Sequence, residues 1–301
     1  MGAARFLAGL VRVVDPATVT AIVNVGDDTV LHGLHISPDL DTVTYTLAGA
    51  INPETGWGLR DESWQAMTMV EQYGGPAWFR LGDRDLGTHL FRTGRLRDGA
   101  PLSRVTAEIA RAWGLELTVL PATDDALRTM VTVAGEGEIG FQDYFVGRQH
   151  SVAVTALRFE GASGARPAPG VLDALRDADV VVIAPSNPLV SIAPVLAVPG
   201  VRDALRAVRA RTVAVSPIVA GAALKGPADR MLRELGHEPS VVGVARLYVD
   251  VASALVVDEA DAAHAPAVED AGMTCIVTPT VMSTPDIAAD LARTTIGAPA
   301  R

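Results

Sequence analysis

Apolar positions along this chain follow two patterns, one with helical spacing and one of short uninterrupted runs. The clearest run spans residues 179–184 and stops at Pro185-Ser-Asn-Pro188. A run without polar alternation is typical of a strand buried on both faces, hence of a parallel sheet. Helices are predicted at 4–13, 41–48, 62–73, 101–113, 171–177, 201–210, 228–235 and 285–293, and strands at 19–25, 31–36, 117–120, 130–134, 152–159, 179–184, 212–216, 253–257 and 274–278.

The order of these elements predicts the fold class. Strands and helices take turns through the C-terminal half, which is typical of a doubly wound, mainly parallel, Rossmann-like α/β sheet. The pattern weakens over roughly 80–170, which we interpret as an inserted smaller α+β subdomain within one domain spanning 1–301; Gly161–Pro169 is the candidate linker. The chain opens on a helix directly after Gly2, where such folds open with a strand and a glycine loop, so we expect the first strand to be missing from this sequence.

Composition narrows the class of protein. With 301 residues and 49% hydrophobic content, the chain can bury a sizeable core. A formal net charge of −10 disfavours broad nucleic-acid binding. The single cysteine, Cys275, excludes an intrachain disulfide and a cysteine zinc cage. No signal peptide and no apolar run of about 18 residues is found. We therefore expect a cytoplasmic protein without membrane or nucleic-acid partners.

Carboxylates gather in an early glycine-bearing stretch, residues 24–64. Carboxylates with water suit Mg²⁺, and Asp41 can also accept a proton from a substrate hydroxyl. The alternative is that Asp39 or Asp41 caps the helix that follows. The stretch contains Asp27, Asp28, Asp39, Asp41, Asp61 and Glu62, the last two beside tryptophans.

Two loops follow apolar strands and carry polar side chains. Ligands of open α/β sheets bind beyond the carboxyl ends of the strands. In the first loop, Ser186 and Asn187 can donate to a phosphate or a base, with Pro188 fixing the exit; in the second, Ser216 precedes Lys225, the only lysine, which suits a diphosphate. The alternatives are a helix-capping turn and a connecting loop with a solvated lysine. Together the loops indicate a nucleotide-sized ligand.

A third segment, 78–89, combines aromatic and basic residues. Arg80 and Arg84 can clamp a phosphate or stack on a flat ring, and Trp57, Trp64 and Trp78 can form a wall for an aromatic substrate. The alternative is weak arginine–aspartate pairing at the surface, with the tryptophans in the core. The six histidines show no metal-ligand spacing, and neither a Walker A motif nor a Gly-x-Ser-x-Gly elbow occurs.

Read together, these segments resemble the 2-phospho-L-lactate transferase family, which acts in coenzyme F-420 biosynthesis. The resemblance covers essentially the whole chain, and the alanine- and arginine-rich composition is similar to the actinobacterial branch. It is carried by Asp-Asp at 27–28, Ser-Pro-Asp-Leu-Asp-Thr-Val-x-Tyr-Thr-Leu-Ala-Gly at 37–49, Gly-Trp-Gly-Leu at 56–59, Trp-Phe-x-Leu-Gly-Asp-Arg-Asp-Leu at 78–86, Pro-Ser-Asn-Pro at 185–188 and Ser-Pro-Ile-x-x-Gly-x-Ala-x-Lys-Gly-Pro-Ala-Asp at 216–229.

The resemblance implies an activity. Such a protein moves a phosphoenolpyruvyl or 2-phospholactyl group from a guanosine diphosphate conjugate to a hydroxyl of the deazaflavin Fo, releases GMP, uses Mg²⁺ and forms a homodimer. The implied residues are Asp41 and Asp61 for catalysis and metal binding, Asp41, Arg80 and Trp78 for Fo, and Gly2, Ser186, Asn187, Pro188, Ser216 and Lys225 for the nucleotide.

The N-terminus departs from the family pattern. The family opens with a hydrophobic strand and Gly-Gly-x-Gly-Gly-Ala, of which only Met-Gly-Ala-Ala-Arg-Phe-Leu is present. Two other functions stay open. A nicotinamide-dependent dehydrogenase requires a Gly-x-Gly-x-x-Gly opening, which this chain lacks. A nucleotide-binding regulatory protein of the same superfamily would tolerate loss of Asp41 or Asp61.

Overall fold

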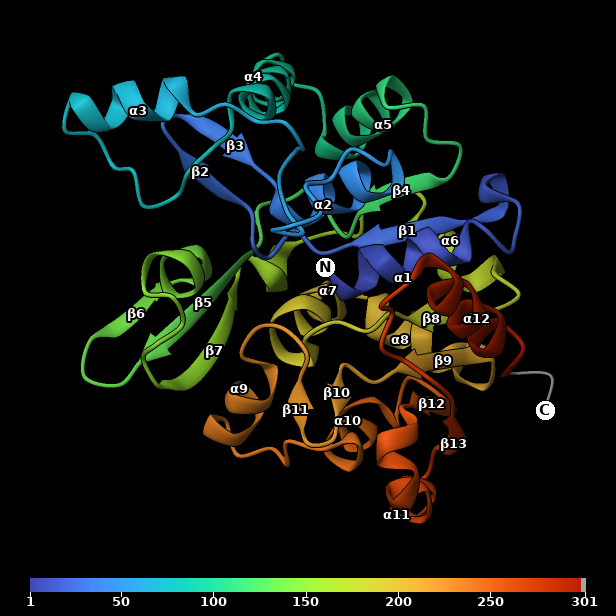
Figure 1. The fold of residues 1–301 in the computed structure, drawn as a ribbon. Coiled ribbons are helices and arrows are strands. Elements are labelled where there is room, and N and C mark those ends of the chain that lie inside the picture. The colour runs from blue at the N-terminus through green and yellow to red at the C-terminus, as the bar shows by residue number, and fades with distance from the viewer. Residues whose placement is uncertain (299–301) are drawn as a thin grey trace.

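A four-stranded parallel sheet lies at the centre of the C-terminal half of the protein (Figure 1). We describe residues 1–298 of a computed structural model. The strands of the sheet lie in the order β13 (Thr274–Val277), β12 (Ala254–Val257), β9 (Thr212–Val215) and β8 (Val181–Ile183). The register aligns Val182 with Val213 and Val213 with Ala254. All four strands were predicted, and their parallel order confirms the α/β class.

Alternate residues of the central strands point to opposite faces, and helices cover both. Val213 and Val215 pack in one apolar cluster with Phe6 and Leu291, which come from α1 (Gly2–Leu10) and α12 (Pro285–Ile296). Ala214 of the same strand belongs to the main core on the other face, with side chains of α8 (Val201–Ala207) and α10 (Val241–Tyr248). Because both faces are buried, these strands read as continuous apolar runs, and the doubly wound prediction is confirmed.

A second parallel pair joins β1 (Thr20–Val23) to β4 (Thr118–Pro121), with Thr20 opposite Thr118. Within residues 1–298, no strand pair connects β1 or β4 to β8. After β1 the chain forms the hairpin β2 (Thr29–Leu31) and β3 (Leu34–Ile36) and then a group of helices (Figure 1). These are α2 (Pro38–Leu47), α3 (Gln65–Gln72), α4 (Asp83–Arg97) and α5 (Leu102–Ala112).

A small antiparallel sheet, β6-β5-β7, completes the fold. Two hydrogen bonds attach it and the turn that follows β6 to the loop after β1: Thr129 N donates to Gly26 O at 2.7 Å, and Gln142 Nε2 donates to Asp27 O at 3.1 Å. Its strands are β5 (Arg128–Val133), β6 (Gly137–Gly140) and β7 (Val154–Glu160). All three strands fall within the predicted insertion at roughly 80–170. Strand β4 also falls within it, but β4 pairs with β1, which lies outside the insertion. The limits of the insertion stay a prediction.

Some elements differ from the sequence prediction. The single strand expected at 31–36 is a hairpin, because His32 and Gly33 both adopt the positive φ of a tight two-residue turn. The long helix α4 was missed because Gly87 and Gly94 weaken its helical signal. Other unpredicted or connecting elements are α10, α11 (Ala265–Asp270), β6, α7 (Ala193–Ala197), β10 (Ile218–Val219) and β11 (Ala222–Ala223); α6 (Val171–Asp177) and α9 (Ala228–Glu234) were predicted.

Among residues 1–298, no single helix has the length and apolar character needed to cross a membrane. One pair of helices, Pro188–Ala197 and Val201–Ala207, has the required length and apolar composition when taken together, but the two are bent by 93° relative to each other.

Candidate functional site

The loop after β1 holds a buried carboxylate at the carboxyl end of a parallel strand. Asn24 Nδ2 donates to Asp39 Oδ2 at 2.9 Å, and Asn24 Oδ1 accepts from Gly26 N at 2.8 Å. Asp27 is only 9% exposed, and within the described chain its Oδ1 has no hydrogen-bond partner. Burial, followed by the charge of Asp39, raises the pKa of Asp27 well above its ordinary value. A buried oxygen of this kind is a place for a cation or a proton.

Gly26 shapes the same loop. A Cβ at this position would lie 2.7 Å from Thr129 Oγ1 and 2.9 Å from Pro194 Cβ, so a larger residue cannot be accommodated without displacing both neighbours. The glycine therefore lets the small antiparallel sheet and α7 close directly against the loop that carries Asp27.

The next carboxylates have partners. Asp28 accepts from Ser37 Oγ at 2.7 Å and contacts His35 Nε2 at 2.9 Å, while burial raises its pKa. Asp39 and Asp41 lie in the first turn of α2, where the helix dipole favours negative charge. Neither is the capping residue of α2, which is Ser37, so the alternative that one of them caps the helix is wrong.

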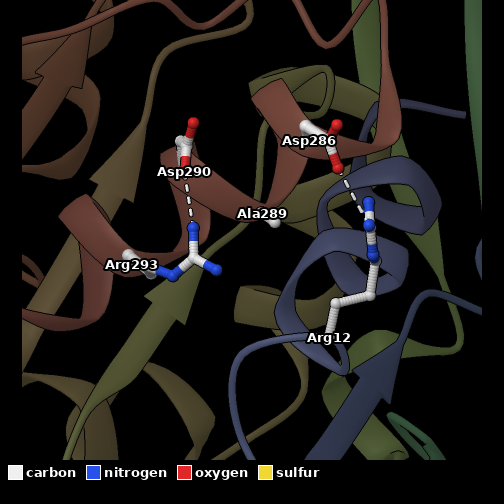
Figure 2. Close-up of a pocket in the computed structure, with 5 residues that line it drawn as sticks. All are labelled: Arg12, Asp286, Ala289, Asp290 and Arg293. Carbon is white, nitrogen blue, oxygen red and sulfur yellow. Dashed lines mark hydrogen bonds and ion pairs between the residues drawn. The ribbon is translucent and has the colours of Figure 1, made fainter.

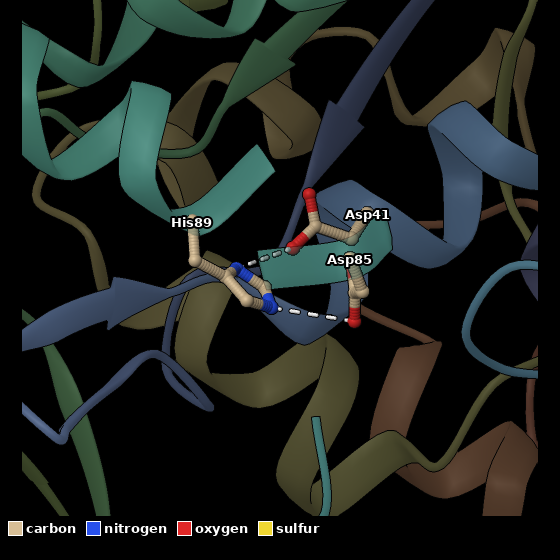
Figure 3. Close-up of side chains that lie close together, drawn as sticks. All are labelled: Asp41, Asp85 and His89. Atoms are coloured by element: carbon tan, nitrogen blue, oxygen red, sulfur yellow. Dashed lines mark ion pairs between the residues drawn. The ribbon is translucent and has the colours of Figure 1, made fainter. Parts of the chain in front are cut away.

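Asp41 belongs to a buried polar network between α2 and α4. Arg92 donates to both of its carboxylate oxygens, with Nη1 to Oδ2 at 3.1 Å and Nη2 to Oδ1. His89 lies between two aspartates: Nδ1 is 3.8 Å from Asp41 Oδ2, and Nε2 is 3.3 Å from Asp85 Oδ2 (Figure 3). Tyr45 donates to Asp85 Oδ1 at 2.6 Å. Arg92 and His89 are each 1% exposed, so these two side chains are closed off from bulk water.

Charge balance in this network sets the ionisation of Asp85. Burial alone would raise the pKa of Asp85, but the contacts with His89 and Tyr45 and the charge of Arg92 lower it below its ordinary value. Burial and the charges of Asp41 and Asp85 raise the pKa of the Tyr45 hydroxyl, which therefore stays a donor. Asp41, Asp85 and His89 lie close enough to one another to hold a metal ion. In this structure the guanidinium of Arg92 supplies the positive charge beside Asp41.

Sequence reasoning gave Asp85, His89 and Arg92 no role. The signal that could have revealed them is their spacing, Asp85-x₃-His89-x₂-Arg92, which lines one face of a helix. This spacing places the three side chains on one face only if the segment is a helix, and no helix was predicted there.

The aromatic residues form an exposed surface beside this network. The guanidinium of Arg80 lies 5.1 Å from the centroid of the Trp64 ring, a cation–π contact. Trp78 is 43% exposed and packs edge-on against Phe79. Among the described residues, Arg80 forms no ion pair, so the alternative of arginine–aspartate pairing does not describe it. A small cavity nearby is lined by Trp57, Trp64, Glu62 and Asp85, among others.

The second predicted metal ligand does not belong to this group. Asp61 is exposed and adopts a positive φ of 54°. Among residues 1–298, the group around Asp41 that could hold a metal ion contains Asp85 and His89 and not Asp61.

The predicted nucleotide loops lie close to each other. A Cβ on Gly2 would be 2.1 Å from the carbonyl oxygen of Pro185, so Gly2 abuts the loop that carries Ser186 and the buried Pro188. Asn187 Oδ1 accepts from Leu189 N at 2.9 Å, which makes Asn187 the turn cap that the alternative foresaw. Its Nδ2 is 3.8 Å from the sulfur of Met231 in α9, the helix that follows the second loop.

The second loop is more open. Ser216 is buried, and its hydroxyl donates to Ile218 O at 3.0 Å and accepts from Ile218 N at 3.1 Å. Lys225 is exposed between β11 and α9 and forms no hydrogen bond or ion pair with the rest of the described chain. Ser216 thus shapes the turn, while Lys225 keeps its charge available to a ligand.

A larger cavity, about 290 Å³, lies elsewhere, between α12 and Arg12 in the turn that follows α1. Arg12 pairs with Asp286 at 2.9 Å, and Arg293 pairs with Asp290 (Figure 2). None of the predicted site residues lines this cavity. Its charges are already neutralised at the surface, so we do not count it as part of the candidate site.

Known structures share this architecture. Two solved structures of a Bacillus halodurans protein, one described as a member of the UPF0052 family, have TM-scores of 0.62 and 0.61. Each is 17% identical and covers at least 97% of this chain and 96% of its own. At this identity the likeness concerns the fold, and it assigns the chain to the class of α/β proteins with that architecture.

The sequence relatives narrow the class to one family. The family model described as 2-phospho-L-lactate transferase CofD matches residues 1–277. A protein named phosphoenolpyruvate transferase from Streptomyces griseus is 45% identical over 97% of this chain and 94% of its own length, and one of the same name from Kitasatospora aureofaciens is 44% identical over 98% and 94%. The chain belongs to the CofD family of 2-phospho-L-lactate transferases. The predicted family, and with it a transferase of coenzyme F-420 biosynthesis, is confirmed.

Proposed function

We propose that this protein transfers a phosphoenolpyruvyl group, or the related 2-phospholactyl group, from a guanosine diphosphate conjugate to a hydroxyl of the deazaflavin Fo, with release of GMP. The observation that carries the proposal is the family match over residues 1–277, together with relatives about 45% identical that are named phosphoenolpyruvate transferase. Those names favour phosphoenolpyruvate as the three-carbon acid.

The acceptor half of the proposed site combines Asp41 with the aromatic surface. Fo carries a flat ring, and Trp78 with the Arg80–Trp64 pair offers exposed faces on which such a ring can stack. Asp41 orients the acceptor hydroxyl and takes its proton as the new bond forms. Support for this role comes from the fixed carboxylate of Asp41, which Arg92 holds through both oxygens.

The donor half consists of Gly2, the Ser186–Pro188 loop and the Ser216–Lys225 loop. The close approach of Gly2 to Pro185 places the start of α1 beside the Ser186–Pro188 loop, and exposed Lys225 provides a compact positive charge for the diphosphate. The acceptor oxygen attacks the phosphorus that carries the three-carbon acid, the bond from this phosphorus to the bridging oxygen breaks, and GMP leaves with that oxygen. Lys225 and Arg80 lower the barrier by offsetting negative charge in the transition state.

Magnesium is part of the proposal. The residues present fit a hard cation, because Asp27 has a buried carboxylate oxygen beside Asp39 that has no partner among residues 1–298. Asp27 and Asp39 are better supported as ligands than the expected pair of Asp41 and Asp61, because neither Asp41 nor Asp61 has, within residues 1–298, a buried carboxylate oxygen without a partner. Bound Mg²⁺ would neutralise charge on the diphosphate. Cytoplasmic location and a homodimer complete the proposal; sedimentation velocity at micromolar concentrations tests the dimer.

The test is direct. The purified protein is incubated with Fo, the guanosine donor and Mg²⁺, and GMP and the acidic deazaflavin product are separated by chromatography. We expect both products in equal amounts, their loss with excess EDTA, and preference for the phosphoenolpyruvate donor over the phospholactate donor. Folded protein that yields neither product with either donor would refute the transferase assignment and favour a nucleotide-binding regulatory role.

A further inference from the structure

The buried face of α4 carries polar side chains that none of the roles above uses. Asp85, His89 and Arg92 follow one another at helical spacing and face Asp41 and Tyr45 of α2. We infer that Arg92, with His89 beside it, is a positioning residue that fixes the Asp41 carboxylate in the orientation from which it meets the acceptor hydroxyl. The inference rests on the proposed function, because it takes Asp41 to act on the acceptor.

The contact between Arg92 and Asp41 has the geometry that fixes orientation. Two nitrogens of one planar guanidinium donate to the two oxygens of one carboxylate. Such a fork defines the plane of the carboxylate as well as its position, which a single hydrogen bond or a lysine ammonium does not. Arg92 is itself held, since Nη1 also lies 3.5 Å from His35 O.

His89 fixes the fork from the side. Arg92 Nη1 lies 3.2 Å from His89 Nδ1, and because a guanidinium can only donate, Nδ1 is the acceptor. The ring proton therefore sits on Nε2, which faces Asp85 Oδ2 at 3.3 Å. Asp85 is anchored in turn by the Tyr45 hydroxyl, which also lies 2.7 Å from Thr88 Oγ1. The chain of contacts thus runs from α2 through α4 and back to α2.

Stability alone does not explain this arrangement. Removing both charges from water offsets much of the attraction within a buried ion pair, so an apolar pair of similar volume would join α2 to α4 equally well. An apolar pair would not provide a carboxylate with a defined orientation at the start of α2, where Asp41 is 5% exposed. The network therefore points to orientation as its role.

The decisive variant is Arg92→Lys, which keeps the charge and loses the fork. Arg95→Lys is the matched control, because Arg95 lies on the same helix and makes its own two-pronged contact with Glu108, at 2.9 and 3.0 Å, away from Asp41. We expect Arg92→Lys to lower kcat by about 10- to 100-fold, since misplacement of a reacting group by about 1 Å can cost that much. The KM for the guanosine donor should change less than about twofold, and Arg95→Lys should match the wild type in both constants.

A double variant separates positioning from a general structural role. If Arg92 acts through Asp41, then Arg92→Lys should cause no further loss of kcat in an Asp41→Asn background. Should Arg92→Lys not fold, His89→Leu removes the acceptor of Arg92 Nη1 and should show the same loss of kcat at unchanged donor KM. His89→Asn, which restores an acceptor near the position of Nδ1, should recover part of the loss.

The outcomes distinguish this inference from the proposed function. Absence of transfer by the wild-type protein would refute the function itself. With an active wild type, the positioning role is overturned by an Arg92→Lys protein of unchanged kcat, by an equal loss in Arg95→Lys, or by the same fold-loss with and without the carboxylate of Asp41.

Discussion

Replacing Arg92 with methionine should destabilise this protein strongly, because it would leave the carboxylate of Asp41 buried without a partner. The side chains of Arg92 and Asp41 are 2% and 8% exposed, so neither can be rescued by bulk water. Removal of one partner from such a pair costs about 3–5 kcal/mol. A chain of 301 residues has an unfolding entropy of about 0.6 kcal/mol per kelvin at about 2.1 cal/mol/K per residue, so the midpoint should fall by about 5–8 °C.

Two further variants show whether the reasoning is right. Arg95→Met breaks a pair whose side chains are 30% and 24% exposed, which should cost about 1 kcal/mol or less and lower the midpoint by no more than about 2 °C. The double variant Asp41→Leu/Arg92→Met replaces the ion pair by an apolar pair and should recover most of the lost stability.

The assay is thermal unfolding followed by circular dichroism, without ligands, at one pH and one protein concentration. Refolding on cooling is checked first, because the free-energy argument requires reversibility. An Arg92→Met protein that melts within 2 °C of the wild type, or a double variant that melts as low as the single one, would show that the buried carboxylate is not the source of the effect.

Four other changes test other parts of the structure. Gly9→Ala should cost about 1–3 kcal/mol, since its Cβ would lie 2.4 Å from the backbone of Ala288. Gly94→Ala, in open space on α4, should gain up to about 1 kcal/mol, and chemical denaturation measures both. The pKa of Asp27 is raised in the folded state, so the free energy of unfolding should fall as pH rises from the ordinary pKa of an aspartate through the raised pKa of Asp27. Thermal melting in EDTA at several pH values measures this fall, which should be lost in Asp27→Asn. Lys225→Ala should raise the donor KM about 10-fold with little change in the acceptor KM, measured by GMP release.

The fold was largely predictable because its central strands are buried on both faces. Residues 212–215 are all buried, so hydrophobicity alone marks them as a parallel strand. The hairpin at 29–36 was not predictable from hydrophobicity, since its only clear signal is the turn at His32-Gly33. Helix α4 carries two glycines and six charged side chains, and tertiary contacts with β3 and α5 hold it where local propensity does not.

The candidate site was predictable in its residue types and less so in their partners. Asp41 was singled out, but its partner Arg92 lies 51 residues away, and no local pattern connects the two. In the sequence, Asp27 was one of six candidate carboxylates with nothing to set it apart. Only packing against the small sheet and α7 shows that one of its oxygens is buried and has no partner within the described chain. Long-range contacts of this kind depend on the fold, which a single sequence does not specify.

Lys225 gives this protein an unusual chemical property. With one lysine in 301 residues, the chain has a single side-chain amine, and it is exposed on the loop between β11 and α9. An amine-reactive acylating reagent would therefore modify one internal position, besides the N-terminal amine. Mass spectrometry of that one peptide, with and without the guanosine donor, would read occupancy of the proposed phosphate site as protection from acylation.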